Sequence, residues 1–350
     1  RSFSHWIGGM GVLVFIMAFL PLGGGQNMHI MRAESTGAEV SKIVPKMKHM
    51  AMILYIIYFA FTAVMFITLL ISGMNVFDSL NTAFATAGTG GFGFRNDSFA
   101  SFGSAQQIIV TVFMLLFSVN FNSYYLILRL KFKDAINSEV RTFFVVVIAA
   151  IAIITLNVYT RFDSIGEALK HVSFSVASLI STTGFSTVDF SLWPSLATTV
   201  LVLVMFVGGC AGSTAGGMKV SRFIILVKGL FRELGAIVHP KQVKKITIDQ
   251  RPLDREVVRS VNAYVVCYVL MFATSLILIS FDNKDLVTNF TAVAATINNV
   301  GPGLSEIGPA SNFSGFSWFS KLVLSFNMLA GRLELFPMLI LFSPSTWKKT

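Results

Sequence analysis

Long apolar runs, separated by connections of two kinds, constrain the fold of this chain more than any other feature. A helix that crosses a bilayer needs about 20 apolar residues. Runs of that size occur near 5–24, 50–73, 107–129, 142–160, 194–230 (interrupted), 258–281 and 318–342. Charged residues make up 13% of the chain, whereas a soluble domain carries about 25%. The sequence therefore predicts an all-α polytopic membrane protein.

Four of the connections are basic. They hold 20 of the 27 Lys and Arg residues and comprise 32–50, 129–141, 219–259 and the tail from 348. Since an excess of Lys and Arg marks the cytoplasmic side, we expect a cell inner-membrane protein with Arg1 outside and the C-terminus in the cytoplasm. The net charge of +10 does not predict nucleic-acid binding, because it lies in loops and not on the basic surface of a soluble fold.

The other three connections face outward and contain an internal repeat. Each of 74–106, 161–193 and 282–317 has an apolar run too short to span, followed by a polar stretch centred on a glycine. Such short runs are typical of re-entrant segments, and irregular backbone at membrane depth must be buried in protein or line water. Half-helices that direct their negative C-terminal ends to one axis favour cations there, and backbone carbonyls can replace an ion's hydration shell. The repeat predicts a cation pore.

A second special stretch, "FVGGCAGSTAGGMKVS" at 206–221, interrupts the longest apolar run. Its five glycines are Gly208, Gly209, Gly212, Gly216 and Gly217. Each glycine costs a helix about 0.8–1 kcal/mol relative to alanine, so we expect the helix to be unwound here. A helix–helix contact between small residues is the structural alternative.

Enzymatic interpretations of the same stretch fit poorly. A phosphate-binding P-loop needs glycine directly before lysine, but Met218 stands between them. Ser213 lacks the flanking pattern of a hydrolase nucleophile, and no histidine is evidently paired with it. We therefore expect no enzymatic activity. A membrane-embedded enzyme stays as a remote alternative, which a titrating histidine or carboxylate beside Ser213 would favour.

Arg332 in "NMLAGRLELF" falls inside an expected span. An arginine at mid-helix costs about 2.5–3.5 kcal/mol on insertion scales, so it usually faces a cavity or a partner. Glu334 is a candidate partner. The alternative is that Arg332 extends to a nearby membrane edge, which its expected distance from the helix end disfavours.

Six separated motifs stand in order along the chain: "HWIGGMGVLVF", "TGGFG", "STTGFST", "GGCAGSTAGGMK", "INNVGPGL" and "GRLELFPMLILFSP". Together they resemble the TrkH family, the membrane subunits of bacterial Trk potassium-uptake systems within the Trk/Ktr/HKT superfamily. The resemblance implies a pore of four unlike membrane–pore-loop–membrane repeats, as in a potassium channel. Residues 1–49 would be the second helix and loop of repeat 1, the rest of which is absent, with repeats 2, 3 and 4 at 50–141, 142–257 and 258–350.

The same resemblance implies a selectivity filter of backbone carbonyls in each repeat. It assigns filter 2 to Thr89, Gly90, Gly91 and Phe92, filter 3 to Thr182, Thr183, Gly184 and Phe185, and filter 4 to Asn299, Val300, Gly301 and Pro302. The central glycines favour potassium. No first filter is present in this chain, which leaves open a sodium-permeable or cation-coupled member of the superfamily.

The resemblance further implies a gate and two kinds of partner. The movable gate is the loop with Gly208, Gly209, Gly212, Ser213, Gly216 and Gly217, and Arg332 repels cations and holds that loop. A TrkA-type ring of nucleotide-binding subunits would dock on the basic connections, although positive-inside charge alone also accounts for 219–259. We also expect a homodimer in the bilayer, potassium as the transported ion, and no bound cofactor. Coupling to protons or sodium stays open.

Overall fold

The computed structural model describes residues 1–11, 47–239, 245–249, 251–333 and 335–341. Its longer helices are α1 (Ser2–Gly9), α4 (Met47–Ile71), α5 (Val76–Ala87), α6 (Ser104–Phe117), α7 (Phe121–Leu128), α9 (Ser138–Val158), α10 (Ile165–Ile180), α11 (Ser195–Val207), α12 (Val220–Val238), α13 (Arg255–Ile279), α14 (Leu286–Ile297), α15 (Trp318–Arg332) and α16 (Leu335–Leu341). Shorter elements are α8 (Phe132–Ala135), β1 (Thr247–Ile248), β2 (Arg251–Pro252), η1 (Tyr159–Arg161), η2 (Phe190–Leu192), η3 (Ser280–Asp282), η4 (Ser305–Ile307) and η5 (Phe313–Gly315). The fold is all-α, with one small antiparallel hairpin formed by β1 and β2.

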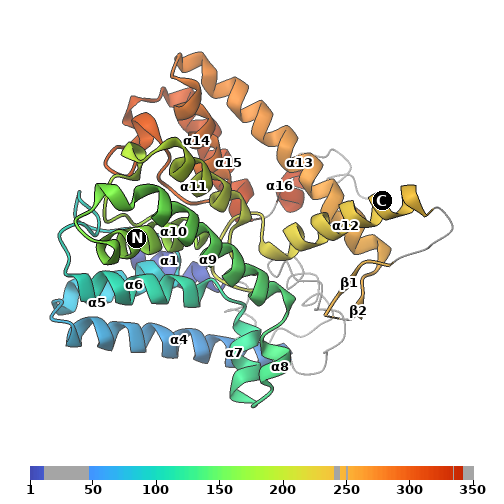
Figure 1. Ribbon diagram of the computed structural model, residues 1–350, viewed down its shortest axis with the longest axis horizontal. Helices are drawn as coiled ribbons and strands as arrows, with labels where there is room; N and C mark the ends of the chain where they lie inside the picture. The colour runs from blue at the N-terminus through green and yellow to red at the C-terminus, as the bar shows by residue number, and fades with distance from the viewer. Residues whose placement is uncertain (12–46, 240–244, 250, 334, 342–350) are drawn as a thin grey trace.

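One three-helix unit recurs along the chain. In each unit a short middle helix contacts a helix before it and a helix after it: α4, α5 and α6; α9, α10 and α11; α13, α14 and α15. Figure 1 shows these units in blue to cyan, green, and orange to red, one above the other in that view. The first two units each have a buried apolar cluster of their own, and two smaller clusters lie in the third.

Neighbouring units join in a constant way. The last helix of one unit packs against the middle helix of the next, α6 on α10 and α11 on α14. Helix α1 makes the same contact with α5. The middle helices are thereby drawn toward one another, which brings their C-terminal turns together at the centre of the molecule.

The middle helices are too short to cross a bilayer. They have 12, 16 and 12 residues, and a rise of 1.5 Å per residue gives roughly 18–24 Å, against a hydrocarbon core of about 30 Å. Each begins at a residue whose side chain accepts a hydrogen bond from the backbone three residues on: Asn75, Ser164 and Asp285. The expectation of three half-helices is confirmed.

Helices α4, α9 and α13 are long and apolar enough to cross a membrane, and two bent pairs could add two more spans among the described residues. One pair corrects an expectation. The run 107–129 was expected to be a continuous span, but α6 and α7 meet at 91°. The run 318–342 is likewise two helices, α15 and α16, set at 119°. Most of the run 5–24 and of the basic connection 32–50 lies outside the described residues.

Candidate functional site

The three half-helices end in the same turn. The first residue past the helix cap has positive φ in each: 52° at Thr89, 57° at Thr182 and 56° at Asn299. The next backbone N–H then bonds back five residues, from Gly90 to Ala85 at 2.7 Å, Thr183 to Ser178 at 2.9 Å and Val300 to Ala295 at 2.8 Å. This is the Schellman motif. It stops the helix and turns the chain so that the following backbone crosses the half-helix end.

The central glycines of the three expected filter segments also share a backbone conformation. Gly91, Gly184 and Gly301 have φ of 62°, 85° and 112°. A Cβ on Gly91 would overlap the carbonyl oxygen of Thr183, and a Cβ on Gly184 would overlap that of Val300. Segments 89–92, 182–185 and 299–302 therefore lie edge to edge in succession, with a carbonyl oxygen against a glycine at both contacts. At Gly301 no described atom lies within 4 Å of such a Cβ.

The residues after the glycines differ in their surroundings. Phe185 is 2% exposed, and its ring meets Phe99 edge to face at 4.6 Å. The ring of Phe92 instead lies under the Arg1 guanidinium, 3.8 Å from its centroid. Pro302 has its Cδ 3.1 Å from where a Cβ on Gly184 would lie.

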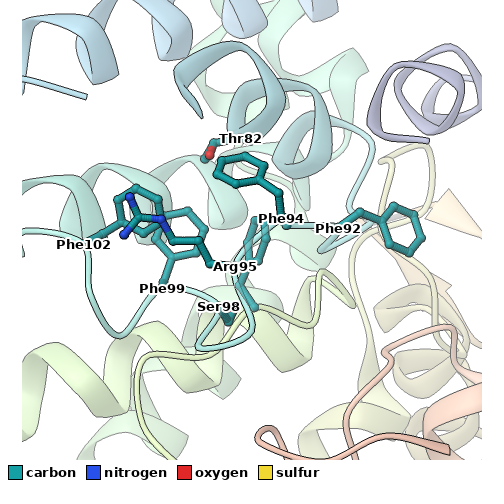
Figure 2. A pocket seen from close by; sticks show the side chains of 9 residues that line it. Thr82, Phe92, Phe94, Arg95, Ser98, Phe99 and Phe102 are labelled. Atoms are coloured by element: carbon teal, nitrogen blue, oxygen red, sulfur yellow. The ribbon is translucent and has the colours of Figure 1, made fainter. Parts of the chain in front are cut away.

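A small pocket lies beside residues 92–95, with Phe94, Arg95, Phe99 and Phe102 in its lining, and the ring of Phe92 points away from these side chains (Figure 2). Its cavity volume is about 10 Å³, which is close to the least that one water molecule needs. The pocket is therefore packing space and no ligand site. Among the described residues, no group of three or more His, Cys, Asp or Glu could hold a metal ion.

The glycine-rich stretch is unwound, as its composition predicts. Helix α11 ends at Val207 and α12 begins at Val220. We call the non-helical segment between them, 208–219, the hinge loop. It folds back on itself: Gly209 N–H bonds Gly216 at 3.4 Å, and a Cβ on Gly217 would lie 2.7 Å from the Cα of Gly208.

The hinge loop lies directly against the ends of all three half-helices. Thr89 donates its hydroxyl to the Thr214 carbonyl at 2.8 Å. The Gly216 N–H donates to the Thr182 hydroxyl at 2.7 Å. A Cβ on Gly216 would lie 2.6 Å from the carbonyl oxygen of Asn298. The two left-handed threonines thus turn the chain and also bind the loop.

Arg332 joins the hinge loop to α1. Its Nη1 donates to the Thr214 carbonyl at 3.1 Å, and its Nη2 donates to the Gly8 and Gly9 carbonyls at 3.2 and 3.5 Å. The expected position of Arg332 in mid-helix is wrong, because it is the last residue of α15. A cation is favoured at the C-terminal end of a helix. The expected partner Glu334 lies outside the described residues.

Ser213 has no nucleophile geometry in this loop. Its hydroxyl donates to the Cys210 carbonyl at 2.6 Å and accepts the Ala215 N–H at 3.3 Å. Both bonds are local and shape the turn. Ser213 is therefore a structural residue of the hinge loop, alongside Gly212, whose φ is 72°.

Two anchors of the hinge loop were missed by sequence reasoning. The first is the break between α6 and α7, where Ser118 accepts the Cys210 N–H at 2.9 Å and Phe121 donates to Gly212 at 3.1 Å. The second is Glu139, whose Oε1 accepts the Ala211 N–H at 2.7 Å. The paired asparagines in "SVNFNS" signal the break, and a lone carboxylate beside an apolar span signals Glu139.

Comparison with known proteins agrees with this geometry. The sequence model of the TrkH family, described as a cation transport protein, matches residues 1–349. The chain is 34% identical to the Trk system potassium uptake protein TrkH of Escherichia coli K12, over 100% of this chain and 73% of that protein. It is 30% identical to Trk system potassium uptake protein TrkG of the same organism, over 99% and 72%. The crystal structure of the potassium transporter TrkH from Vibrio parahaemolyticus superposes with a TM-score of 0.86 at 32% identity, covering 99% of this chain and 72% of that one.

Proposed function

Because the chain belongs to the TrkH family of cation transport proteins, we propose that it carries potassium into the cell through a filter of backbone carbonyls. The observation that supports this most is the contact between filters. Each filter glycine of repeats 2 and 3 faces a carbonyl oxygen of the next filter. Carbonyl rings of this kind replace the hydration shell of a cation, and the half-helix C-termini add negative potential at the same place.

The filters on this proposal are Thr89 to Phe92, Thr182 to Phe185 and Asn299 to Pro302. They belong to repeats 2, 3 and 4 at 50–141, 142–257 and 258–350. Helix α1 contacts α5 as α6 contacts α10 and α11 contacts α14. That relation supports 1–49 as the second helix and loop of repeat 1, in a pseudo-fourfold pore.

The hinge loop, 208–219, is the gate on this proposal. It lies across the ends of the half-helices and is tied to Thr89, Thr182 and Arg332 by single hydrogen bonds. Its glycines permit the backbone changes that opening needs. Arg332 adds a positive charge beneath the filter, which disfavours cations while the loop is closed.

The membrane potential suffices to drive uptake. A potential of about 100 mV is worth roughly 2.3 kcal/mol per charge, which corresponds to roughly 40-fold accumulation. Coupling to protons or sodium is not needed for that. With the basic connections in the cytosol, the C-terminus is cytoplasmic, and a TrkA-type nucleotide-binding ring would dock on 32–50, 129–141 and 219–259 of a homodimer in the cell membrane.

The deciding experiment is rubidium and sodium uptake into proteoliposomes that hold the whole protein, under an imposed potential. Rubidium influx above sodium influx supports a potassium pore. Equal influx, or a preference for sodium, would move the protein to the sodium-conducting side of the superfamily. Absence of both fluxes, restored by adding the TrkA-type ring, would show that the gate is shut without its partner.

A further inference from the structure

Glu139 holds the hinge loop from the side opposite the filters. It is the second residue of α9, and it is 8% exposed. Its Oε1 accepts the Ala211 N–H at 2.7 Å. Ser221, in the first turn of α12, and Lys219, at the end of the loop, interact with the same carboxylate. One buried side chain thus binds the middle of the loop and interacts electrostatically with Lys219 at its exit.

A buried carboxylate is expensive unless it is hydrogen-bonded, so its partners define where the loop must lie. Charge-assisted hydrogen bonds of this kind are about twice as strong as neutral ones. The loop's bonds with Thr89 and Thr182 involve neutral hydroxyls, the first as donor and the second as acceptor. In its ionised form Glu139 therefore holds the loop more firmly than either hydroxyl does.

The residue next to Glu139 is bound by the β1–β2 hairpin. Ser138 donates both its N–H, at 2.8 Å, and its hydroxyl, at 2.5 Å, to Oδ1 of Asp249 at the hairpin turn. The hairpin is also fixed to α12, because Lys228 donates to the Thr247 carbonyl at 2.7 Å. Figure 1 shows the hairpin beside α12, at the far end of α9 from the half-helices.

The hairpin is itself a packed element. Ile246, which precedes it, is buried with Ile225 of α12 and with Val258 and Val261 of α13. A displacement of the hairpin would therefore move α12, which leads out of the hinge loop, and would pull on the first turn of α9, which carries Glu139. Both contacts converge on the same loop.

We propose that Glu139 is the positioning residue of the hinge loop and that the β1–β2 hairpin acts on the loop through Asp249 and the first turn of α9. The hairpin lies in the basic connection 219–259, where a cytosolic partner would bind. The role of the hairpin in gating rests on the function proposed above, whereas its role in placing the hinge loop does not.

Hydrogen exchange of the 208–219 segment, measured by mass spectrometry on the whole protein in lipid nanodiscs, tests the first step. Glu139→Ala removes the acceptor, and exchange of the segment should rise about tenfold or more. Glu139→Gln should restore most of the protection, because its amide oxygen can still accept the Ala211 N–H. The matched control is Glu256→Ala, at an exposed carboxylate in the first turn of α13. Unchanged exchange in Glu139→Ala would overturn the assignment.

A double-mutant cycle tests the second step. Asp249→Ala should raise exchange of 208–219 about two- to fivefold, since the bond is exposed and weaker, whereas Asp254→Ala, at an exposed Asp nearby, should not. In a Glu139→Ala background, Asp249→Ala should add nothing further. Additive effects would show that the hairpin does not act through Glu139. Rubidium flux in the same variants separates the two proposals: faster exchange with unchanged flux keeps the positioning role and rejects the gate.

Discussion

At the residue scale, a filter glycine is required where a neighbouring carbonyl oxygen occupies the space of a Cβ. This holds at Gly91 and Gly184, where the neighbours are Thr183 and Val300. The positive φ alone is a weaker constraint, because threonine and asparagine adopt it two residues earlier in the same segments. The collision, and not the backbone angle, therefore makes these positions sensitive to substitution.

Replacing Gly184 by Ser should lower the preference for rubidium over sodium by about tenfold. That factor corresponds to a loss of about 1.4 kcal/mol in the binding free energy of rubidium relative to sodium. The added Cβ overlaps the Val300 carbonyl, so that oxygen must move away from the ion path. The measurement is the ratio of rubidium to sodium flux in proteoliposomes.

Gly73→Ala is the matched control for that change. Gly73 has a φ of 85°, and a Cβ on it meets no atom within 4 Å. The Gly73→Ala substitution therefore introduces backbone strain at a similar φ without a collision. The ratio of rubidium to sodium flux should stay as in the wild type. Equal losses of selectivity in both variants, or no loss in Gly184→Ser, would contradict the filter assignment.

Arg332→Ala should raise basal rubidium flux by about tenfold, because hydrogen bonds from a charged donor are worth roughly 1.5–3 kcal/mol. The change removes one of the hydrogen bonds to the Thr214 carbonyl and the link from the hinge loop to Gly8. Arg332→Lys should restore part of the effect, since an ammonium lacks the planar fork that spans both carbonyls.

Arg259→Ala, at an exposed arginine of α13, controls for the loss of one positive charge. It should leave basal flux unchanged. A flux that stays flat in a folded Arg332→Ala protein would rule out the loop as a gate held by this residue.

At the element scale, the sequence predicts some helix breaks and misses others for a physical reason. The break between α11 and α12 follows from five glycines, each of which weakens a helix. The break between α6 and α7 has neither Gly nor Pro. It is stabilised instead by Asn120, whose side chain accepts the Asn122 N–H at 2.8 Å, and by bonds that Ser118 and Phe121 make with Cys210 and Gly212 of the distant hinge loop. The asparagines are a weaker local signal than five glycines, because a remote segment completes this break.

Asn120→Ala removes the cap of α7 and should lower the free energy of unfolding by about 1 kcal/mol. Because the freed turn carries Ser118 and Phe121, which bind the hinge loop, basal rubidium flux should rise as well. Thermal unfolding and flux are measured on the same preparation.

Ser317→Ala removes the cap of α15, where the side chain accepts the Ser320 N–H at 3.2 Å. It should cost a similar free energy and leave flux unchanged. If both variants alter flux equally, the effect reports general destabilisation, and the α6–α7 break has no particular connection with the gate.

At the scale of the whole molecule, the repeat was readable because each unit restates the same pattern of polar cap, short apolar helix and glycine. The pairing of units was not readable, since the contacts of α6 with α10 and of α11 with α14 join segments far apart in sequence. The same applies to Glu139 and Asp249, single carboxylates whose partners lie 72 and 111 residues away. The recurring glycine segments could be located from sequence, and the residues that hold the hinge loop in place could not.

The charge asymmetry of the molecule predicts where a cytosolic partner binds. Neutralising Lys241, Lys244 and Lys245 to Gln should weaken binding of a TrkA-type ring by about tenfold at low ionic strength. The effect should shrink in high salt, because exposed charges are screened beyond about 10 Å at 0.1 M. Lys241 and Lys244 lie outside the described residues, and Lys245 is exposed beside the hairpin. Surface plasmon resonance on nanodisc-held protein measures the affinity.

The matched control makes the same charge change in the connections expected to face outward, at Lys170, Lys284 and Lys321. If docking occurs on the basic side, this triple variant should bind the ring as the wild type does. Equal weakening in both variants would mean that net charge alone governs the encounter. Unchanged affinity in the first variant would exclude 240–245 as a contact. In that case a signal that reaches the β1–β2 hairpin would have to come through another surface of the 219–259 connection.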